Sequence, residues 1–283
     1  MKKTIAVFAA ILIILLSACA AKPAEQADFI AATTAPAAEI ARTLLDGTGV
    51  EVRQLITEQV SCLHDYSLSV EQMKTAQSSA AVVISGLGLE DFMEDALRGC
   101  QVIDASGQVE ALPGEEGKDP HIWMDPENMA KMTKTVSESL QTLFPDDAAR
   151  IRQNEEAYCE KLDELSAYGR EQLQNLSCRK LVTFHDGFSY FAEAFDLEIA
   201  AAMEVEPGSE PSAKELEAVI TVVKENAIPA VFTERNGTTD AAELVARETG
   251  VRTAALDLAM SLDGRTYFDA VKANIDTIKD VLG

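Results

Sequence analysis

The sequence predicts an α/β protein of two lobes, each a mainly parallel β-sheet flanked by helices, with one long helix joining the lobes. Short apolar, β-branched runs alternate with helical patterns in both halves of the chain, and such alternation is typical of parallel sheets. Between the halves, residues 148–176 keep apolar side chains at helical spacings. A helix of about 28 residues would be roughly 42 Å long, which exceeds a small domain. We therefore expect a joining helix over residues 147–176 that runs along both lobes.

The chain begins with a pattern typical of export. Lys2 and Lys3 precede an apolar stretch from Ile5 to Leu16, which is too short to cross a bilayer core of about 30 Å as a helix. The next residues, Leu16-Ser17-Ala18-Cys19, resemble a bacterial lipobox, whose cysteine is lipidated. We expect residues 1–19 to be a lipoprotein signal peptide; an ordinary signal peptide with a chance cysteine is the alternative. Residues 20–36, rich in Ala, Pro and Thr, are expected to form a flexible tether.

The charge balance argues against polyanionic partners. Lys plus Arg number 24 and Asp plus Glu number 47, which gives a formal net charge of −23 over 283 residues. Nucleic acids and anionic lipid headgroups would be repelled by this surface, so no nucleic-acid partner is expected. The same charge favours solubility and raises the cation concentration near the surface; the simpler interpretation is solubility alone. The protein is expected to be a monomer.

The cysteines fit an exported protein. With Cys19 assigned to lipid, four cysteines remain in a compartment that permits disulfides. We favour the pairings Cys62–Cys100 and Cys159–Cys178, because each pair lies within one half of the chain. Buried free thiols are the alternative. A cysteine-based zinc cluster is not expected, because no C-x-x-C spacing occurs.

The N-terminal lobe is expected over residues 37–146. A helix-like run starts at Glu39 and overlaps a strand candidate at 50–56. Ser69, followed three residues later by Gln72, predicts a capping box for a helix over 69–76. Asp125 and Pro126 predict the N-cap and first turn of a helix that runs to Leu143. The other expected elements are strands at 80–85 and 101–105, a helix at 90–97 and an acidic loop at 106–118.

The C-terminal lobe is expected over residues 177–283. Ser212 and Glu215 form a second capping-box pattern, which opens a helix to Asn226. Gly250 predicts the end of a helix over 240–249, because glycine is favoured in the left-handed position after a helix. The other expected elements are strands at 180–184, 198–205, 230–233 and 251–256, and helices at 188–195 and from 265 or 266 to 282.

The three histidines predict a metal site. His64, His121 and His185 each follow a strand or a loop that leaves one, and Asp257 follows the last strand. Ligands of parallel sheets bind beyond the carboxyl ends of the strands, so the fold could bring these residues together. Three imidazoles and a carboxylate are a natural ligand set for tetrahedral Zn²⁺. Taken singly, each histidine could instead be an ordinary surface or hydrogen-bonded residue.

Two glutamates lie at strand ends in the same way. Glu206 and Glu234 are candidates for orienting an imidazole N–H from outside the ligand set, which is how carboxylates commonly support metal-binding histidines. The alternative is that both are solvated charges at the edge of the lobe.

A series of motifs occurs in an order that resembles a known family. They are the lipobox at Cys19, Leu63-His64-Asp65-Tyr66, the stretch 119–126 (DPHIWMDP), the strand into His185, the stretch 206–212 (EPGSEPS), Phe232-Thr233-Glu234 and Leu256-Asp257. In these motifs the chain resembles the metal-binding subunits of bacterial ABC transporters for zinc and manganese. The likeness covers nearly everything after the tether.

This resemblance implies a structure and a function. The joining helix would be rigid, and the metal would lie between the lobes, bound by His64, His121, His185 and Asp257. The protein would be lipid-anchored through Cys19 on the extracytoplasmic face of the cell membrane. It would deliver its ion to a membrane permease powered by an ATPase.

The ligand types favour Zn²⁺. Manganese members of the family usually carry a carboxylate where this chain has His185, and imidazole suits zinc better than harder ions. A manganese or iron type of binding subunit, with Mn²⁺ as the cargo, stays open as the alternative. Many zinc members carry a histidine-rich loop before the motif at His121, whereas residues 106–118 contain no histidine.

Other functional classes are less well supported. A zinc hydrolase would need an open coordination position and a nearby general base, but Asp257 would fill the fourth position and no H-E-x-x-H motif occurs. We therefore do not expect an enzyme. A surface adhesin or sensor built on the same lobes is a further alternative.

Overall fold

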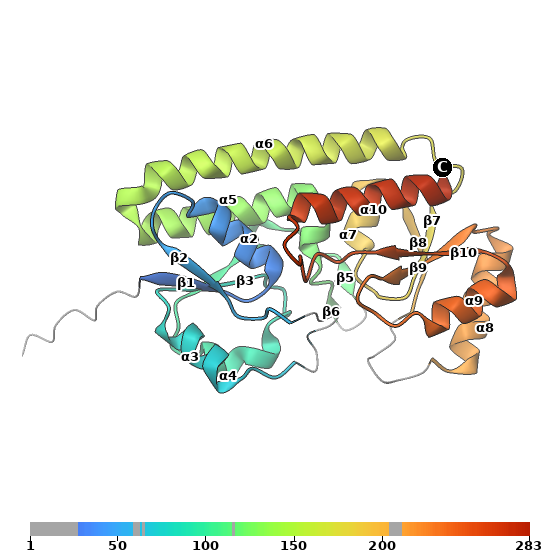
Figure 1. Cartoon of the computed structure of the whole chain (residues 1–283), viewed down its shortest axis with the longest axis horizontal. Coiled ribbons are helices and arrows are strands. Elements are labelled where there is room, and N and C mark those ends of the chain that lie inside the picture. The colour runs from blue at the N-terminus through green and yellow to red at the C-terminus, as the bar shows by residue number, and fades with distance from the viewer. Residues whose placement is uncertain (1–27, 59–62, 64–65, 115–116, 204–210) are drawn as a thin grey trace, which may run out of the picture.

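Two parallel β-sheets form the cores of two lobes in the computed structural model of this chain (Figure 1). The structure describes residues 28–58, 63, 66–114, 117–203 and 211–283. The N-terminal sheet has the order β2-β1-β3-β4 and the C-terminal sheet the order β10-β9-β7-β8, with every pairing parallel. The predicted fold class is therefore confirmed.

The N-terminal lobe is built on four short strands, of which β1 and β3 are wholly apolar. Its strands are β1 (Phe29–Ala32), β2 (Glu51–Gln54), β3 (Val82–Ile84) and β4 (Val102–Asp104). Its helices are α2 (Ala35–Leu44), α3 (Val70–Ser78), α4 (Glu94–Leu97) and α5 (Pro126–Leu143). A small hairpin of β5 (Pro113–Gly114) and β6 (Gly117–Lys118) precedes the loop that carries His121.

The predicted tether is wrong at its C-terminal end. Residues 29–32 form β1, which is buried throughout and lies in the middle of the sheet between β2 and β3. The next helix begins at Ala35, where Thr34 accepts a hydrogen bond from the backbone of Ala37. Alanine-rich composition suggested a linker, but small side chains also fit a strand covered on both faces by helices.

Local capping signals predicted helix starts well. Ser69 and Gln72 form the expected capping box of α3, and Asp125 caps α5 by accepting the backbone N–H of Glu127 at 2.8 Å. The predicted helix at 90–97 is largely replaced by a short 3₁₀ helix (Asp91–Met93) and the single turn α4. The helix expected from Glu39 ends at Leu44, before β2.

The C-terminal lobe follows the predicted alternation. Its strands are β7 (Lys180–Thr183), β8 (Glu198–Ala202), β9 (Ala230–Glu234) and β10 (Arg252–Leu256), and its helices are α7 (Ser189–Ala194), α8 (Ala213–Glu225), α9 (Asp240–Thr249) and α10 (Tyr267–Leu282). Ser212 and Glu215 form the capping box of α8, and Gly250 ends α9 with φ of 77°.

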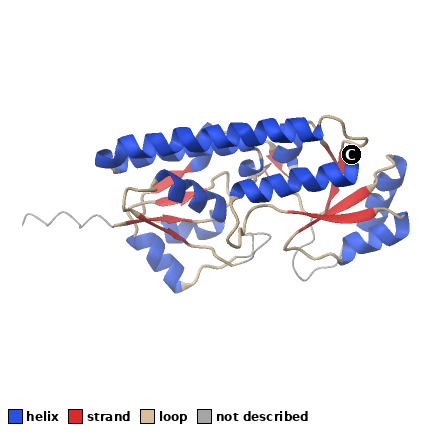
Figure 2. Ribbon diagram, turned by 45° about the horizontal axis from the view of Figure 1, so that its top comes forward, coloured by secondary structure: helices blue, strands red, loops and turns tan. Residues whose placement is uncertain are grey.

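The long helix α6 (Ala148–Leu173) runs along both lobes (Figures 1 and 2). It packs against α2 and α5 of the N-terminal lobe and against α10 of the C-terminal lobe. Gly169 permits a close approach to the C-terminal lobe, because a Cβ there would lie 2.2 Å from the Phe195 ring. One hydrophobic cluster therefore extends from Ile30 in β1 through Leu162 in α6 to Phe191 in α7.

Glu39 joins the two lobes at the start of α10. Its carboxylate accepts the backbone N–H of Tyr267 at 3.0 Å and the hydroxyl of Tyr158, on α6, at 3.3 Å. Burial raises the pKa of the Glu39 carboxyl above its usual value. A side chain of α2 thus satisfies a backbone donor in the first turn of the last helix.

We expect Glu39→Ala to lower the free energy of unfolding by about 1–2 kcal/mol, the usual cost of losing a helix-capping acceptor. Glu39→Gln keeps an acceptor oxygen and should recover most of this loss. Urea unfolding followed by circular dichroism at pH 7 measures both. Equal stability of the alanine variant and the wild type would show that the contact to Tyr267 contributes nothing.

The predicted disulfide Cys159–Cys178 is wrong. Cys100, Cys159 and Cys178 are all free thiols. About 21 Å of helix, at ~1.5 Å per residue, separates Cys159 from the end of α6 at Leu173, and Cys178 lies beyond that end; a disulfide needs Cα atoms within about 7 Å. The proposed pairing of Cys100 with Cys62 is not formed either, although Cys62 itself lies outside the described residues.

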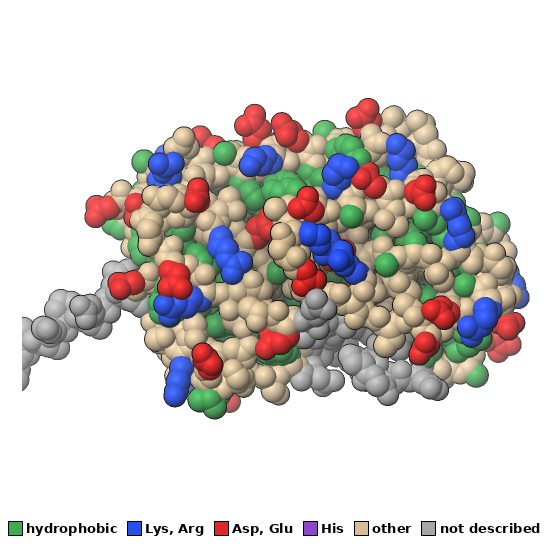
Figure 3. Space-filling view, viewed as in Figure 1, with side chains coloured by type: hydrophobic (Ala, Val, Ile, Leu, Met, Phe, Trp, Pro, Cys, Tyr) green, Lys and Arg blue, Asp and Glu red, His purple; other side chains and the backbone are tan. Residues whose placement is uncertain are grey.

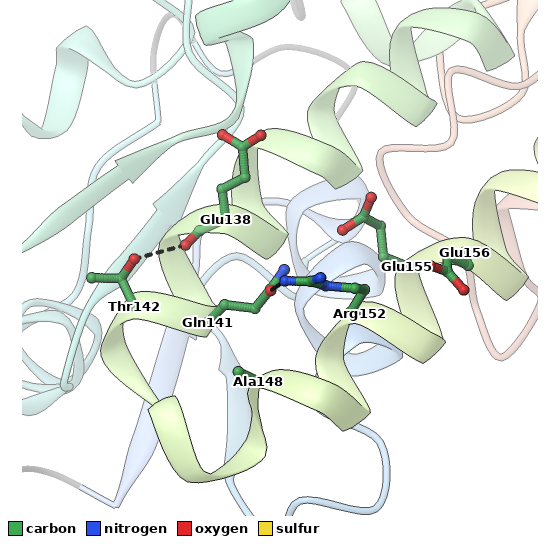
Figure 4. Close-up of a pocket in the computed structure, with 7 residues that line it drawn as sticks. All are labelled: Glu138, Gln141, Thr142, Ala148, Arg152, Glu155 and Glu156. Carbon is green, nitrogen blue, oxygen red and sulfur yellow. Dashed lines mark hydrogen bonds between the residues drawn. The ribbon is translucent and has the colours of Figure 1, made fainter.

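The described surface carries mixed charges and a polar pocket. Acidic side chains are scattered over both lobes in the face shown in Figure 3. A pocket of about 540 Å³ lies between α5 and α6, where Arg152 donates a hydrogen bond to Gln141 and Glu138, Glu155 and Glu156 are among the lining residues (Figure 4). No helix in the described part of the chain combines the length and hydropathy needed to cross a bilayer.

Candidate metal centre

His121 is held by a carboxylate in its own loop. The backbone N–H of His121 and its ring Nδ1 both lie within hydrogen-bond distance of Asp119 Oδ1, at 2.9 Å and 2.8 Å. Asp119 is buried, and its other oxygen has no hydrogen-bond partner among the described residues. Because a carboxylate accepts hydrogen bonds, Nδ1 carries the proton and Nε2 keeps a free lone pair. The loop therefore leaves the Nε2 lone pair of His121 available as a donor atom.

His185 has a similar arrangement at the end of β7. Its ring Nδ1 lies 3.9 Å from Oε2 of Glu234, the last residue of β9, and both side chains are buried. This distance exceeds a hydrogen bond but is short enough for electrostatic attraction. Parallel strands β7 and β9 are neighbours in the sheet, so their carboxyl ends bring these two residues together.

The two imidazoles face each other across the lobes. The distance between Nε2 of His121 and Nε2 of His185 is 3.5 Å. Two zinc–nitrogen bonds of about 2.05 Å at a tetrahedral angle would place the nitrogens about 3.3 Å apart. The observed separation thus fits two ligands of one ion.

Gly187 allows this close approach. A Cβ at position 187 would lie 2.9 Å from Cδ2 of His185, 3.1 Å from Cδ2 of His121 and 2.8 Å from Leu258. Any side chain at this position would therefore press on both imidazoles. Neither composition nor periodicity identified this glycine.

The C-terminal lobe anchors the His121 loop. The indole N–H of Trp123, which is fully buried, donates to the carbonyl of Leu258 at 2.7 Å. The hydroxyl of Tyr267 donates to the carbonyl of Trp123 at 2.6 Å, and the hydroxyl of Tyr190 donates to that of Asp119 at 2.9 Å. These contacts fix the His121 loop relative to the C-terminal lobe.

Asp257, the fourth predicted ligand, is bound to arginine. Its Oδ2 accepts from Arg265 at 2.6 Å and lies 3.7 Å from Arg235, while its Oδ1 accepts the backbone N–H of Ala259 at 2.8 Å. The next residue, Leu258, lies beside the histidines, as the position of Gly187 shows. Asp257 therefore precedes a residue that lies beside the imidazoles, but its carboxylate is turned toward two arginines.

The remaining predicted site residues cannot be placed. His64 and Glu206 lie outside the described residues, as does the lipidation candidate Cys19. Within the described ranges, no three His, Cys, Asp or Glu side chains lie close enough together to hold a metal ion. The described part of the site thus consists of two histidines with their carboxylate partners, and the full ligand set stays a prediction.

Sequence reasoning missed three supporting residues. It gave Asp119 no role at the metal site, and it did not consider Arg235 or Arg265. The spacing D-x-H, which places a short acidic side chain two residues before an imidazole, was the available signal for Asp119. No comparable signal exists for the arginines. Arg265 meets Asp257 through the folding of the loop before α10, and Arg235 meets it because β9 pairs with β10.

Asp125, four residues after His121, gives the protein a pH-dependent stability. Burial raises the pKa of its carboxyl from 3.8 to about 6. Because its pKa is higher in the folded than in the unfolded protein, the protonated Asp125 carboxyl makes its full contribution to the free energy of unfolding below pH 3.8. This contribution is lost as the pH rises through 6. We expect Asp125→Asn, which keeps the capping oxygen, to be more stable than the wild type by roughly 2 kcal/mol at pH 7 and equal to it at pH 3.5.

The matched control is Asp269, the acidic member of the capping box of α10. Hydrogen bonds from Thr266 lower the pKa of the Asp269 carboxyl, so its contribution is lost as the pH falls rather than as it rises. Asp269→Asn should therefore destabilise the protein at pH 7. Urea unfolding of both variants and the wild type from pH 3.5 to 7 measures how each substitution changes the free energy of unfolding with pH. The same pH dependence for both substitutions would refute the effect of burial at Asp125.

Comparisons with known proteins agree on one family. The family model described as "Zinc-uptake complex component A periplasmic" matches residues 30–281. The chain is 29% identical over 226 residues to the manganese-binding lipoprotein MntA of Halalkalibacterium halodurans, covering 76% of this chain and 75% of that protein. It is 27% identical over 249 residues to the iron-binding protein YfeA of Yersinia pestis, covering 83% and 80%.

Longer relatives and solved structures extend this agreement. The zinc-binding lipoprotein AdcA of Streptococcus pneumoniae is 28% identical over 242 residues, which are 76% of this chain but 48% of that protein. The crystal structure of ZnuA superposes with a TM-score of 0.81 at 27% identity, covering 91% of this chain and all of that one. The chain therefore belongs to the zinc-uptake complex component A family, the metal-binding solute-binding proteins of ABC transporters, which are not enzymes.

Proposed function

We propose that this protein captures Zn²⁺ outside the cytoplasm and delivers it to its ABC permease. The observation that carries the proposal is the pair of imidazole Nε2 atoms, 3.5 Å apart and each backed by a carboxylate on the far side of its ring. Nitrogen-rich ligand sets suit zinc better than manganese. In the proposed ligand set, His64 and Asp257 complete the coordination, and Glu206 lies near it.

The proposal includes the location and state of the protein. Cys19 carries the lipid that holds the chain on the extracytoplasmic face of the membrane, and the protein acts as a monomer. Relatives named as lipoproteins, MntA and AdcA, support the anchor.

A manganese or iron cargo is the second candidate. It is favoured by the names of two relatives, MntA and YfeA, and by the carboxylate of Asp257, which suits harder ions. Ligand type argues for zinc, but many sites of this kind bind several divalent ions in vitro, and the Irving–Williams order favours zinc over manganese regardless of biological role.

Elemental analysis tests the cargo. The protein is purified without added metal or chelator and analysed for zinc, manganese and iron per chain. We expect about one zinc per chain, which a tenfold excess of Mn²⁺ does not displace during equilibrium dialysis. Manganese or iron at that stoichiometry would support the second candidate, and the absence of any stoichiometric ion would refute both.

A further inference from the structure

Asp257 faces two positive charges in the described structure. Arg265 donates to Oδ2 at 2.6 Å, and Arg235 lies 3.7 Å from the same oxygen. The Asp257 side chain is only 7% exposed, and a charge-assisted hydrogen bond is strong where water is largely excluded. Its ability to donate electron density to a metal is therefore reduced by the arginines.

The position of Asp257 does not depend on Arg265. Its backbone exchanges two hydrogen bonds of 2.8 Å with the side-chain amide of Asn274 on α10. Its Oδ1 accepts the backbone N–H of Ala259. Removing Arg265 would thus leave the aspartate in place, with Oδ2 released from its strongest partner.

The structure around Asp257 leaves room for the Arg265 guanidinium to move away from Oδ2. A pocket of about 260 Å³ lies beside Asp257 and is lined by Arg235, Arg265 and Thr277 among other residues. Arg265 is partly exposed, at 24% of its side chain. Its guanidinium can move into this pocket while Asp257 stays attached to Asn274.

We propose that Arg265 competes with the metal ion for the carboxylate of Asp257 and thereby speeds release of the ion. The proposal rests on the proposed function, because it concerns the same site. When the ion binds, Oδ2 must leave Arg265 or be shared with it, and the guanidinium charge opposes the incoming cation. When the ion leaves, Arg265 takes Oδ2 back. Arg265 is therefore a positioning residue that weakens the carboxylate as a ligand.

The same competition affects the choice of metal. Weakening the one carboxylate in the proposed set lets the imidazoles dominate the affinity, which favours Zn²⁺ over Mn²⁺. Loss of Arg265 should therefore raise the affinity for Mn²⁺ more than the affinity for Zn²⁺. A residue with a purely structural role would not change this ratio.

Stopped-flow release of Zn²⁺ and Mn²⁺ into excess EDTA tests the proposal. We expect Arg265→Gln to release Zn²⁺ about tenfold more slowly than the wild type and to narrow the preference for Zn²⁺ over Mn²⁺. Arg265→Lys, which keeps the charge, should restore most of the wild-type rate. Arg170→Gln is the matched control, since Arg170 makes an exposed ion pair with Glu127 on α5, and it should leave both rates unchanged.

A second background shows whether the effect passes through Asp257. In Asp257→Asn protein, the substitution Arg265→Gln should no longer slow release. The proposal is overturned if Arg265→Gln releases zinc at the wild-type rate or faster, or if it slows release equally in the Asp257→Asn background. A wild-type protein that holds no ion would refute the proposed function itself, and the competition with it.

Discussion

His121→Ala is expected to lower the affinity for Zn²⁺ by more than about 100-fold. Removing a residue that only orients a metal-binding histidine typically costs 10- to 100-fold in affinity, and removing the ligand should cost more. Nε2 of His121 lies 3.5 Å from Nε2 of His185, so its loss leaves one side of the proposed site without a donor. Competition with a chromophoric chelator at pH 7 measures the affinity.

Asp119→Asn provides the graded comparison. It removes the charge that fixes the tautomer of His121, through the contact of 2.8 Å to Nδ1, but leaves the imidazole in place. We expect a loss of about 10- to 100-fold, smaller than that of the alanine variant. Glu127→Gln, on the exposed surface of α5, serves as the control with a similar loss of charge. Unchanged affinity and stoichiometry in His121→Ala would refute the site.

Trp123→Ala is expected to destabilise the protein by about 3–5 kcal/mol, the usual cost of truncating a large aromatic side chain in a core. Trp123 is completely buried and joins the His121 loop to the C-terminal lobe. Because its indole donates to the carbonyl of Leu258, truncation also leaves that buried acceptor unpaired. Urea unfolding of the metal-free protein measures the change.

Trp123→Phe separates packing from hydrogen bonding. It keeps most of the ring volume but removes the donor to Leu258, so we expect a loss of about 1–3 kcal/mol. Metal affinity should fall in both variants, because the loop that carries His121 loses one of its three hydrogen bonds to the second lobe. If Trp123→Ala unfolds at the wild-type urea concentration, the indole does not join the lobes in the way described.

Helix starts and ends that are set by a capping residue close in the sequence were predicted correctly. The capping boxes at Ser69 and Ser212, the Asp125-Pro126 start of α5 and the glycine end of α9 all occur as expected. Each depends on a side chain that bonds a backbone group within a few residues. All the residues that form such a cap therefore lie within a short stretch of sequence and can be recognised there.

Two predictions failed because their outcome depends on contacts distant in the sequence. The strand β1 was taken for part of a tether, because its burial depends on β2, β3 and the helices that cover them. The Cys159–Cys178 pairing failed because α6 continues straight past Cys159 to Leu173. Composition was compatible with a tether or a strand at residues 29–32, and with a disulfide or free thiols at Cys159 and Cys178. Contacts between residues distant in the sequence decided between them.

The sequence by itself determined the kinds of donor, their places after strands and the starts of the helices beside them, because these depend on residue type and short spacing. Only the tertiary structure decided that His121 and His185 meet across the lobes, that Asp119 fixes one imidazole, and that Asp257 turns to Arg265. Those contacts join residues whose separation is set by the packing of both lobes along α6, which no local pattern encodes.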